Sequence, residues 1–113
     1  MGIQIFGRSK CFDTKKAMRF FKERGVKFQY IDLAEYGFSP REFDSVLQAV
    51  GGADALINPK SKSPQYDVYR YLVTEQEKAD KLWDYPELIR TPVVRNGKQA
   101  VVGDCPDEWK KWL

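Results

Sequence analysis

The chain has 113 residues, a formal net charge of +3 and a hydrophobic fraction of 42%, which is the balance of one globular domain and not of a fibrous or disordered chain. It contains no histidine and two widely separated cysteines, so histidine-dependent catalysis is excluded, and neither a metal site nor a secreted disulfide framework is expected. No apolar run is long enough for a membrane span, we expect no leader peptide, and the basic residues alternate with acids. We therefore expect a cytoplasmic protein, monomeric, that binds neither membranes nor nucleic acid.

The first 32 residues predict a strand, a loop, a helix and a second strand. An apolar run over residues 3–6 ends at Gly7, and apolar residues then recur at helical spacing from Asp13 until Gly25. Residues 28–31 alternate in part, as in a strand. A helix that connects two strands favours a parallel pair. Cys11 lies in the loop that joins the first strand to the helix.

The middle of the chain predicts helices. Ser39, followed by Pro40 and by Glu42, is typical of a capped helix start, and Gly51-Gly52 ends the apolar repeat that follows. Residues 53–85 alternate short helical patterns with a turn-rich loop. We interpret residues 39–88, approximately, as a helical insertion.

The last part of the chain predicts a hairpin and a terminal helix. Asn96-Gly97 separates two short apolar runs, which is a strong signal for an antiparallel hairpin, and residues 106–113 suit a helix packed on the sheet. The whole order predicts a single α/β domain over residues 1–113. It is the order of a thioredoxin-like fold, with a mixed four-stranded sheet, flanking helices and the central insertion.

Four segments resemble one known family. Residues 6–17 (Phe-Gly-Arg-Ser-Lys-Cys-Phe-Asp-Thr-Lys-Lys-Ala) resemble the active-site loop of the arsenate reductase-like (ArsC/Spx/YffB) proteins, within the thioredoxin/glutaredoxin superfamily. Residues 58–61, 88–94 and 96–98 resemble further segments of these proteins, in the same order. The resemblance covers nearly the whole chain and implies that Cys11 is the reactive group.

Departures from the family pattern bear on the reaction. Arsenate reductases of this type hold the oxyanion with three arginines, and the matching positions here are Lys60, Thr91 and Cys105. Spx regulators typically have a second cysteine three residues after the first, where this chain has Thr14. Both activities are therefore less well supported than a glutaredoxin-like one.

On the residues alone, Cys11 is either a buried structural cysteine or a reactive thiol whose pKa is lowered at the start of a helix. Thr14 lies one helical turn further on, where it either caps the helix or hydrogen-bonds the thiolate. We expect Asp13 to point away from the sulfur. The resemblance implies that Thr91-Pro92 is a cis-proline segment facing Cys11, whereas an ordinary edge proline is the alternative.

The remaining candidate residues are ligand-binding or resolving groups. The resemblance implies that the turn containing Asp104 receives glutathione. Four basic residues are candidates to bind glutathione or another substrate, and the alternative is that they are solvated surface residues: Lys10, Lys15, Lys60 and Arg90. Cys105 is either a small apolar filler or a resolving thiol for Cys11.

These observations favour an enzyme, a glutaredoxin-like or glutathione-dependent thiol-disulfide oxidoreductase, with glutathione as co-substrate and no bound cofactor. Its substrate would be a small thiol compound or a protein disulfide. The first alternative is a Spx-like module that binds RNA polymerase or another protein without catalysis, and the second is an arsenate reductase.

Overall fold

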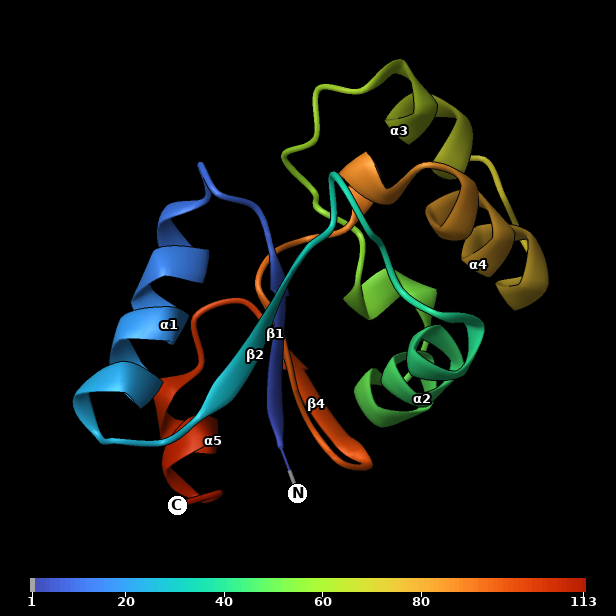
Figure 1. Cartoon of the computed structure of the whole chain (residues 1–113). Helices are drawn as coiled ribbons and strands as arrows, with labels where there is room; N and C mark the ends of the chain where they lie inside the picture. Colours follow the sequence, from blue (N-terminus) through green and yellow to red (C-terminus); the bar gives the residue numbers. More distant parts are fainter. Residues whose placement is uncertain (1) are drawn as a thin grey trace.

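A computed structural model describes residues 2–113 and places a mixed sheet at the centre of the molecule (Figure 1). Its strand order is β2-β1-β3-β4. β1 runs parallel to β2, with Ile5 opposite Tyr30, and antiparallel to β3, with Ile5 opposite Val94. The four strands are β1 (Ile3–Gly7), β2 (Phe28–Asp32), β3 (Val93–Asn96) and β4 (Gln99–Val102). This arrangement confirms the predicted mixed four-stranded sheet.

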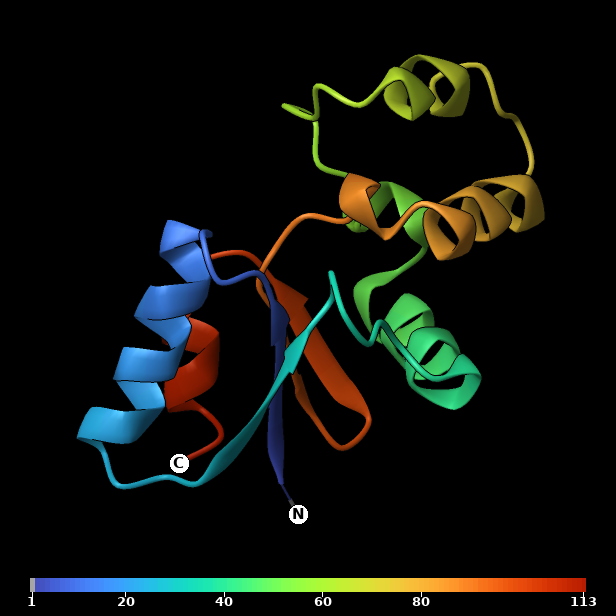
Figure 2. The ribbon, with the colours of Figure 1, turned by 45° about the horizontal axis from the view of Figure 1, so that its top comes forward.

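Two helices cover one face of the sheet, α1 (Phe12–Glu23) and α5 (Pro106–Lys110) (Figure 2). The buried side chains of α1 recur every three or four residues, at Thr14, Ala17 and Phe20–Phe21, so that they form one buried stripe along the helix. Ala17, Phe20 and Phe21 join Trp109 of α5 and the inward side chains of the sheet in one of two core clusters.

Short helices cover the other face (Figure 1), all of them within the predicted insertion. The oxygen of Ser39 accepts the N–H of Glu42 at 3.2 Å, and the Glu42 carboxylate accepts the N–H of Ser39 at 2.9 Å, which completes the expected cap of the first helix. The elements are α2 (Pro40–Val50), η1 (Ala53–Ala55), α3 (Pro64–Tyr69), α4 (Glu75–Asp84) and η2 (Pro86–Leu88), where η1 and η2 are 3₁₀ helices.

The sheet strands divide their side chains between the two clusters. Ile5 and Val94 face α1, whereas the adjacent Phe6 and Val93 face the helical insertion, as the twofold period of a strand requires. Both faces of the sheet are therefore buried. No helix within residues 2–113 is long and apolar enough to cross a membrane.

Three local predictions need correction. α1 begins at Phe12, with Cys11 as its N-cap residue, so Thr14 does not cap it. The hairpin loop consists of Gly97 and Lys98, because Asn96 is still paired with Gln99; Gly97 takes a φ of 61° at the first loop position, where a II′ turn needs glycine. α5 ends at Lys110 instead of continuing to the last residue.

Candidate active site

Cys11 lies where the chain leaves β1 and enters α1. Its backbone is extended, with φ −82° and ψ 120°, and its carbonyl accepts the N–H of Lys15 at 3.2 Å. The side chain is half-buried, and its thiol donates to the carbonyl oxygen of Thr91 at 3.6 Å. The sulfur therefore lies between the first turn of α1 and the segment that opens β3.

The surroundings of the sulfur stabilise the thiolate. Burial opposes ionisation, but hydrogen bonding by the side chains of Thr14 and Thr91, and by the backbone N–H groups of Thr14 and Asp13, outweighs this effect. The pKa of the Cys11 thiol is consequently lowered. A thiolate is the nucleophilic form of cysteine, so this environment increases the reactive fraction of Cys11 at a given pH relative to an ordinary thiol.

Thr14 is completely buried, although it is a polar residue. Its hydroxyl accepts the backbone N–H of Arg8 at 3.4 Å, which links the first turn of α1 to the end of β1. A Cβ atom on Gly7 would lie 2.4 Å from both Cγ2 and Oγ1 of Thr14. The close approach of Thr14 thus requires glycine at position 7. The position of Gly7 at the end of a strand does not by itself indicate this requirement.

Arg8 connects the Cys11 loop by hydrogen bonds to the segment that precedes the cis-proline. Its guanidinium donates to the carbonyl oxygens of Ile89, at 2.9 Å, and of Pro86. Burial lowers the pKa of Arg8, while the negative charges of Cys11, Glu87 and Asp32 act in the opposite direction. Arg8 was not among the expected binding residues, because its partners lie about eighty positions away in the chain.

Tyr30 adds a buried phenol to the same electrostatic environment. Burial raises its pKa, and the charges of Asp32 and Cys11 raise it further. Within residues 2–113 its hydroxyl group has no hydrogen-bond partner. The sequence did not indicate that the Tyr30 hydroxyl is buried near Cys11 and Asp32, because Tyr30 has the pattern of an ordinary strand residue.

The segment before β3 forms the wall opposite α1. The Thr91–Pro92 peptide bond is cis, as the family resemblance implied. The carbonyl of Thr91 faces Cys11, and the carbonyl of Pro92 accepts the N–H of Gly103 at 2.8 Å. The turn between β4 and α5 therefore lies beside the cis-proline segment, at the same end of the sheet as Cys11.

Arg90 packs on that turn. A Cβ atom on Gly103 would lie 2.8 Å from Nη2 of Arg90, so the guanidinium lies directly over the glycine backbone. Asp104 forms an ion pair with Lys16 of α1, with Nζ and Oδ2 3.5 Å apart. Arg90 and Asp104 thus both border the turn that was expected to receive glutathione.

Cys105 is half-buried and is not bonded to Cys11, since both cysteines are free. Its thiol donates to the carbonyl oxygen of Val102 at 3.3 Å. Burial raises its pKa, and the nearby charge of Arg90 offsets this only in part. Cys105 is therefore held as a neutral thiol, and its role as a resolving group stays a prediction.

The candidate lysines lie on the surface. Lys10 and Lys15 are exposed on either side of Cys11 in sequence, and Lys60 is exposed in the loop after η1, where its N–H donates to Oδ1 of Asn58 at 3.0 Å. The N–H of Asn58 donates to the carbonyl of Leu88 at 2.8 Å, so this loop is joined to the segment that leads to Thr91. Asp13 forms an ion pair with Lys16, with Oδ1 and Nζ 4.0 Å apart, and its expected orientation away from the sulfur stays a prediction.

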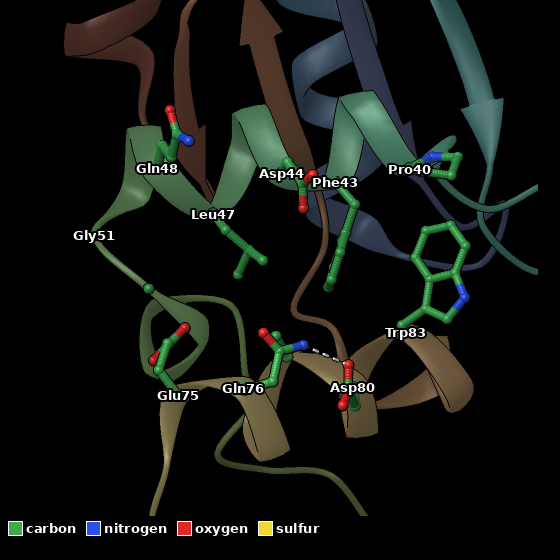
Figure 3. A pocket seen from close by; sticks show the side chains of 12 residues that line it. Pro40, Phe43, Asp44, Leu47, Gln48, Gly51, Glu75, Gln76, Asp80 and Trp83 are labelled. Carbon is green, nitrogen blue, oxygen red and sulfur yellow. Dashed lines mark hydrogen bonds between the residues drawn. The ribbon is translucent and has the colours of Figure 1, made fainter.

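A separate hollow of about 700 Å³ lies between α2 and α4 (Figure 3). Phe43, Leu47 and Trp83 form its apolar wall, and Asp44 and Asp80 stand on opposite sides of it. Cys11 does not line this hollow. The hollow and the surroundings of Cys11 are therefore two separate features of the described residues.

A half-exposed cysteine with a lowered pKa, at the start of the first helix and opposite a cis-proline, defines a thioredoxin-like protein with a single thiol in its active-site loop. The sequence profile of the ArsC family matches residues 6–112, and the chain belongs to the ArsC family.

Individual relatives agree with this assignment. The global transcriptional regulator Spx 2 of Oceanobacillus iheyensis is 24% identical over 115 residues, which span 100% of this chain and 84% of that protein. An ArsC family related protein from Bacteroides fragilis superposes with a TM-score of 0.87 at 18% identity, over 100% of this chain and 98% of that one. The NrdH-redoxin of Escherichia coli, a glutaredoxin-like protein, superposes with a TM-score of 0.52 at 18% identity, over 100% and 96% of the two chains. The thioredoxin-like fold is thus confirmed.

Proposed function

We propose that the protein is a thiol-disulfide oxidoreductase that acts through Cys11. The observation that carries this proposal is the position of the sulfur, half-exposed between the start of α1 and the carbonyl of Thr91, with its pKa lowered. The buried Thr14 and the tether through Arg8 keep this loop in place.

The proposed reaction has two exchange steps. The Cys11 thiolate attacks one sulfur of a substrate disulfide, a bond forms between these two sulfurs, and the other substrate sulfur leaves as a thiolate that takes up a proton. A second thiolate then attacks the mixed disulfide and releases Cys11. In the sum of the two steps, one thiol is consumed and one is released, and the substrate group that Cys11 carried leaves as a disulfide with the second thiol.

Glutathione is the proposed source of the second thiol and, in the reverse direction, a partner in glutathionylation. The turn at Gly103-Asp104 and the Arg90 guanidinium lie beside the cis-proline segment, where they offer a backbone surface and a positive charge to a carboxylate. Cys105 is the alternative second thiol, since it lies on the same turn; its attack on Cys11 would release the substrate thiol and leave a Cys11–Cys105 disulfide, which glutathione would then have to reduce. The proposal places a monomeric protein in the cytoplasm, where thiols are kept reduced, with small thiol compounds or protein disulfides as partners and no membrane or nucleic acid.

Replacement of each cysteine by serine tests the proposal. The pH dependence of alkylation of Cys11 by iodoacetamide gives its pKa, and stopped-flow mixing with glutathione disulfide gives the rate of the first step. We expect a pKa below about 8.5, the ordinary value of a thiol, and complete loss of the reaction in Cys11→Ser. Cys105→Ser is the matched control, and it should retain the first step. A pKa at the ordinary value together with slow reaction contradicts the proposal.

A second candidate is a regulatory module that binds another protein, such as RNA polymerase, without catalysis. The likeness to a transcriptional regulator over the full length of this chain favours it. The same alkylation experiment separates the two candidates, because a binding module does not need a reactive Cys11.

A further inference from the structure

Phe12 is an exposed aromatic residue directly after the reactive cysteine. Its side chain is 68% exposed, and it stands at the first position of α1, between the half-buried Cys11 and Asp13. It belongs to neither of the two core clusters. Solvent exposure of a phenylalanine ring is unfavourable by comparison with burial, and neither packing nor helix formation requires this residue type here.

The ring is held in a defined place. The ammonium group of Lys16, one helical turn further on, lies 5.0 Å from the centroid of the Phe12 ring, a distance at which a cation attracts an aromatic face. Lys16 in turn forms ion pairs with Asp104, at 3.5 Å, and with Asp13, at 4.0 Å. The ring therefore stands between the Cys11 loop and the turn that precedes α5.

Single exposed apolar residues are common on protein surfaces and carry no function by themselves. Tyr36 illustrates this, since it is 77% exposed outside the Cys11 loop and outside α1. Phe12 differs in two respects: it adjoins the nucleophile, and the contact with Lys16 holds its ring. An ordered apolar surface beside a reacting atom is suited to select among substrates, because little conformational entropy is lost when it is covered.

We propose that Phe12 determines specificity by packing against an apolar side chain next to the reacting cysteine of a peptide or protein disulfide. This inference rests on the proposed function, and it assigns the substrate class: protein disulfides with an apolar neighbour, in preference to glutathione disulfide. In the step concerned, the Cys11 thiolate forms a bond with the substrate sulfur while the substrate disulfide breaks. Phe12 takes no part in this bond exchange and acts only by holding the substrate.

Two matched peptides test the inference. Each carries one cysteine as a mixed disulfide with thionitrobenzoate, and they differ only in the residue beside that cysteine, which is leucine in one and serine in the other. Release of coloured thionitrobenzoate measures the first exchange step. We expect the wild-type protein to prefer the leucine peptide by about tenfold, which corresponds to about 1.4 kcal/mol, and Phe12→Ala to reduce that ratio to about one.

Two further variants sharpen this test. Phe12→Leu should keep most of the preference, since it retains an apolar side chain at the site. Tyr36→Ala, which removes an exposed aromatic ring elsewhere, should show the wild-type ratio. An unchanged ratio in Phe12→Ala overturns the inference, and so does an equal loss of rate with both peptides, because an equal loss indicates an effect on Cys11 itself.

Binding without reaction separates this inference from the proposed function. In the Cys11→Ser background, the leucine peptide with alanine in place of its cysteine should shift the NMR signals of residues 12–16, and the serine peptide should shift them less. If the wild-type protein reacts with neither peptide, the proposed function fails, and this binding difference decides the role of Phe12. Equal binding of both peptides, or a difference that persists in Cys11→Ser/Phe12→Ala, overturns the inference.

Discussion

Gly7→Ala tests how closely the reactive loop is packed. The added methyl group would lie 2.4 Å from both Cγ2 and Oγ1 of Thr14 and 3.0 Å from its Cβ, whereas carbon atoms in van der Waals contact are about 3.5–4.0 Å apart. Thr14 must therefore move by about 1 Å or more, and it is completely buried on α1. Overpacking of this kind typically costs about 1–3 kcal/mol of unfolding free energy.

The same displacement should alter the chemistry of Cys11. The Thr14 side chain and its backbone N–H both contribute to lowering the pKa of the thiol, so moving Thr14 should raise that pKa and slow alkylation near neutral pH. Urea unfolding measures the first effect and the pH profile of iodoacetamide alkylation measures the second.

Gly2→Ala is the matched control, because nothing lies within 4 Å of a Cβ atom at that position. It should leave both the unfolding free energy and the Cys11 pKa unchanged. If Gly7→Ala is as stable as the wild-type protein and keeps its alkylation profile, the proposed packing of Thr14 and its effect on the Cys11 pKa are both contradicted.

Three further predictions concern charged groups of the site. The lowered pKa of Cys11 means that its ionisation stabilises the folded state. The difference in unfolding free energy between the wild-type protein and Cys11→Ser should therefore be greatest above about pH 8.5, and it should fall as the pH drops through the pKa of Cys11 in the folded protein. A difference that does not depend on pH would contradict this. Arg8→Met leaves two carbonyl oxygens without their donor and should cost about 1–3 kcal/mol in urea unfolding, with Arg8→Lys restoring part of the loss; equal stability of all three proteins would refute the tether. Arg90→Ala should raise the KM for glutathione substrates while changing the melting temperature little, since the side chain is exposed, and an unchanged KM would count against a binding role.

The fold was predictable because local signals agreed with one another. The apolar run over residues 3–6 and the cap at Ser39 and Glu42 are both signals that lie within a few residues of the chain. The order of these elements was sufficient to predict the sheet. The one-residue error in the hairpin loop arose because Asn96 and Gly97 are both good turn residues, and only the pairing of Asn96 with Gln99 shows where the strand ends.

The site was only partly predictable. Cys11, Thr91 and Pro92 were identified from the family resemblance, and Thr14 from its spacing. Gly7 was interpreted only as the end of a strand, because the approach of a side chain from the following helix cannot be read from spacing.

The contacts of Arg8 could not be predicted from the sequence either. Its two acceptors are carbonyl oxygens, and every residue has one, so no residue type in the distant segment indicated the contact.

The placement of the arginines bears directly on arsenate. Arginine binds an oxyanion through a planar fork of N–H groups, which lysine does not reproduce. Arg8 already donates to two carbonyl oxygens, and Arg90 lies against Gly103. Neither guanidinium is thus placed to hold an oxyanion on Cys11 as the three family arginines do.

We therefore expect no turnover of arsenate when glutathione and glutaredoxin are supplied, under conditions in which the protein reacts with glutathione disulfide. A known arsenate reductase in the same coupled assay is the positive control. Turnover that is clearly above the rate without enzyme, and that is lost in Cys11→Ser, would show that Lys60 or Arg90 rearranges to bind the oxyanion. The charges around the thiol in the resting protein would then not determine which substrate Cys11 accepts.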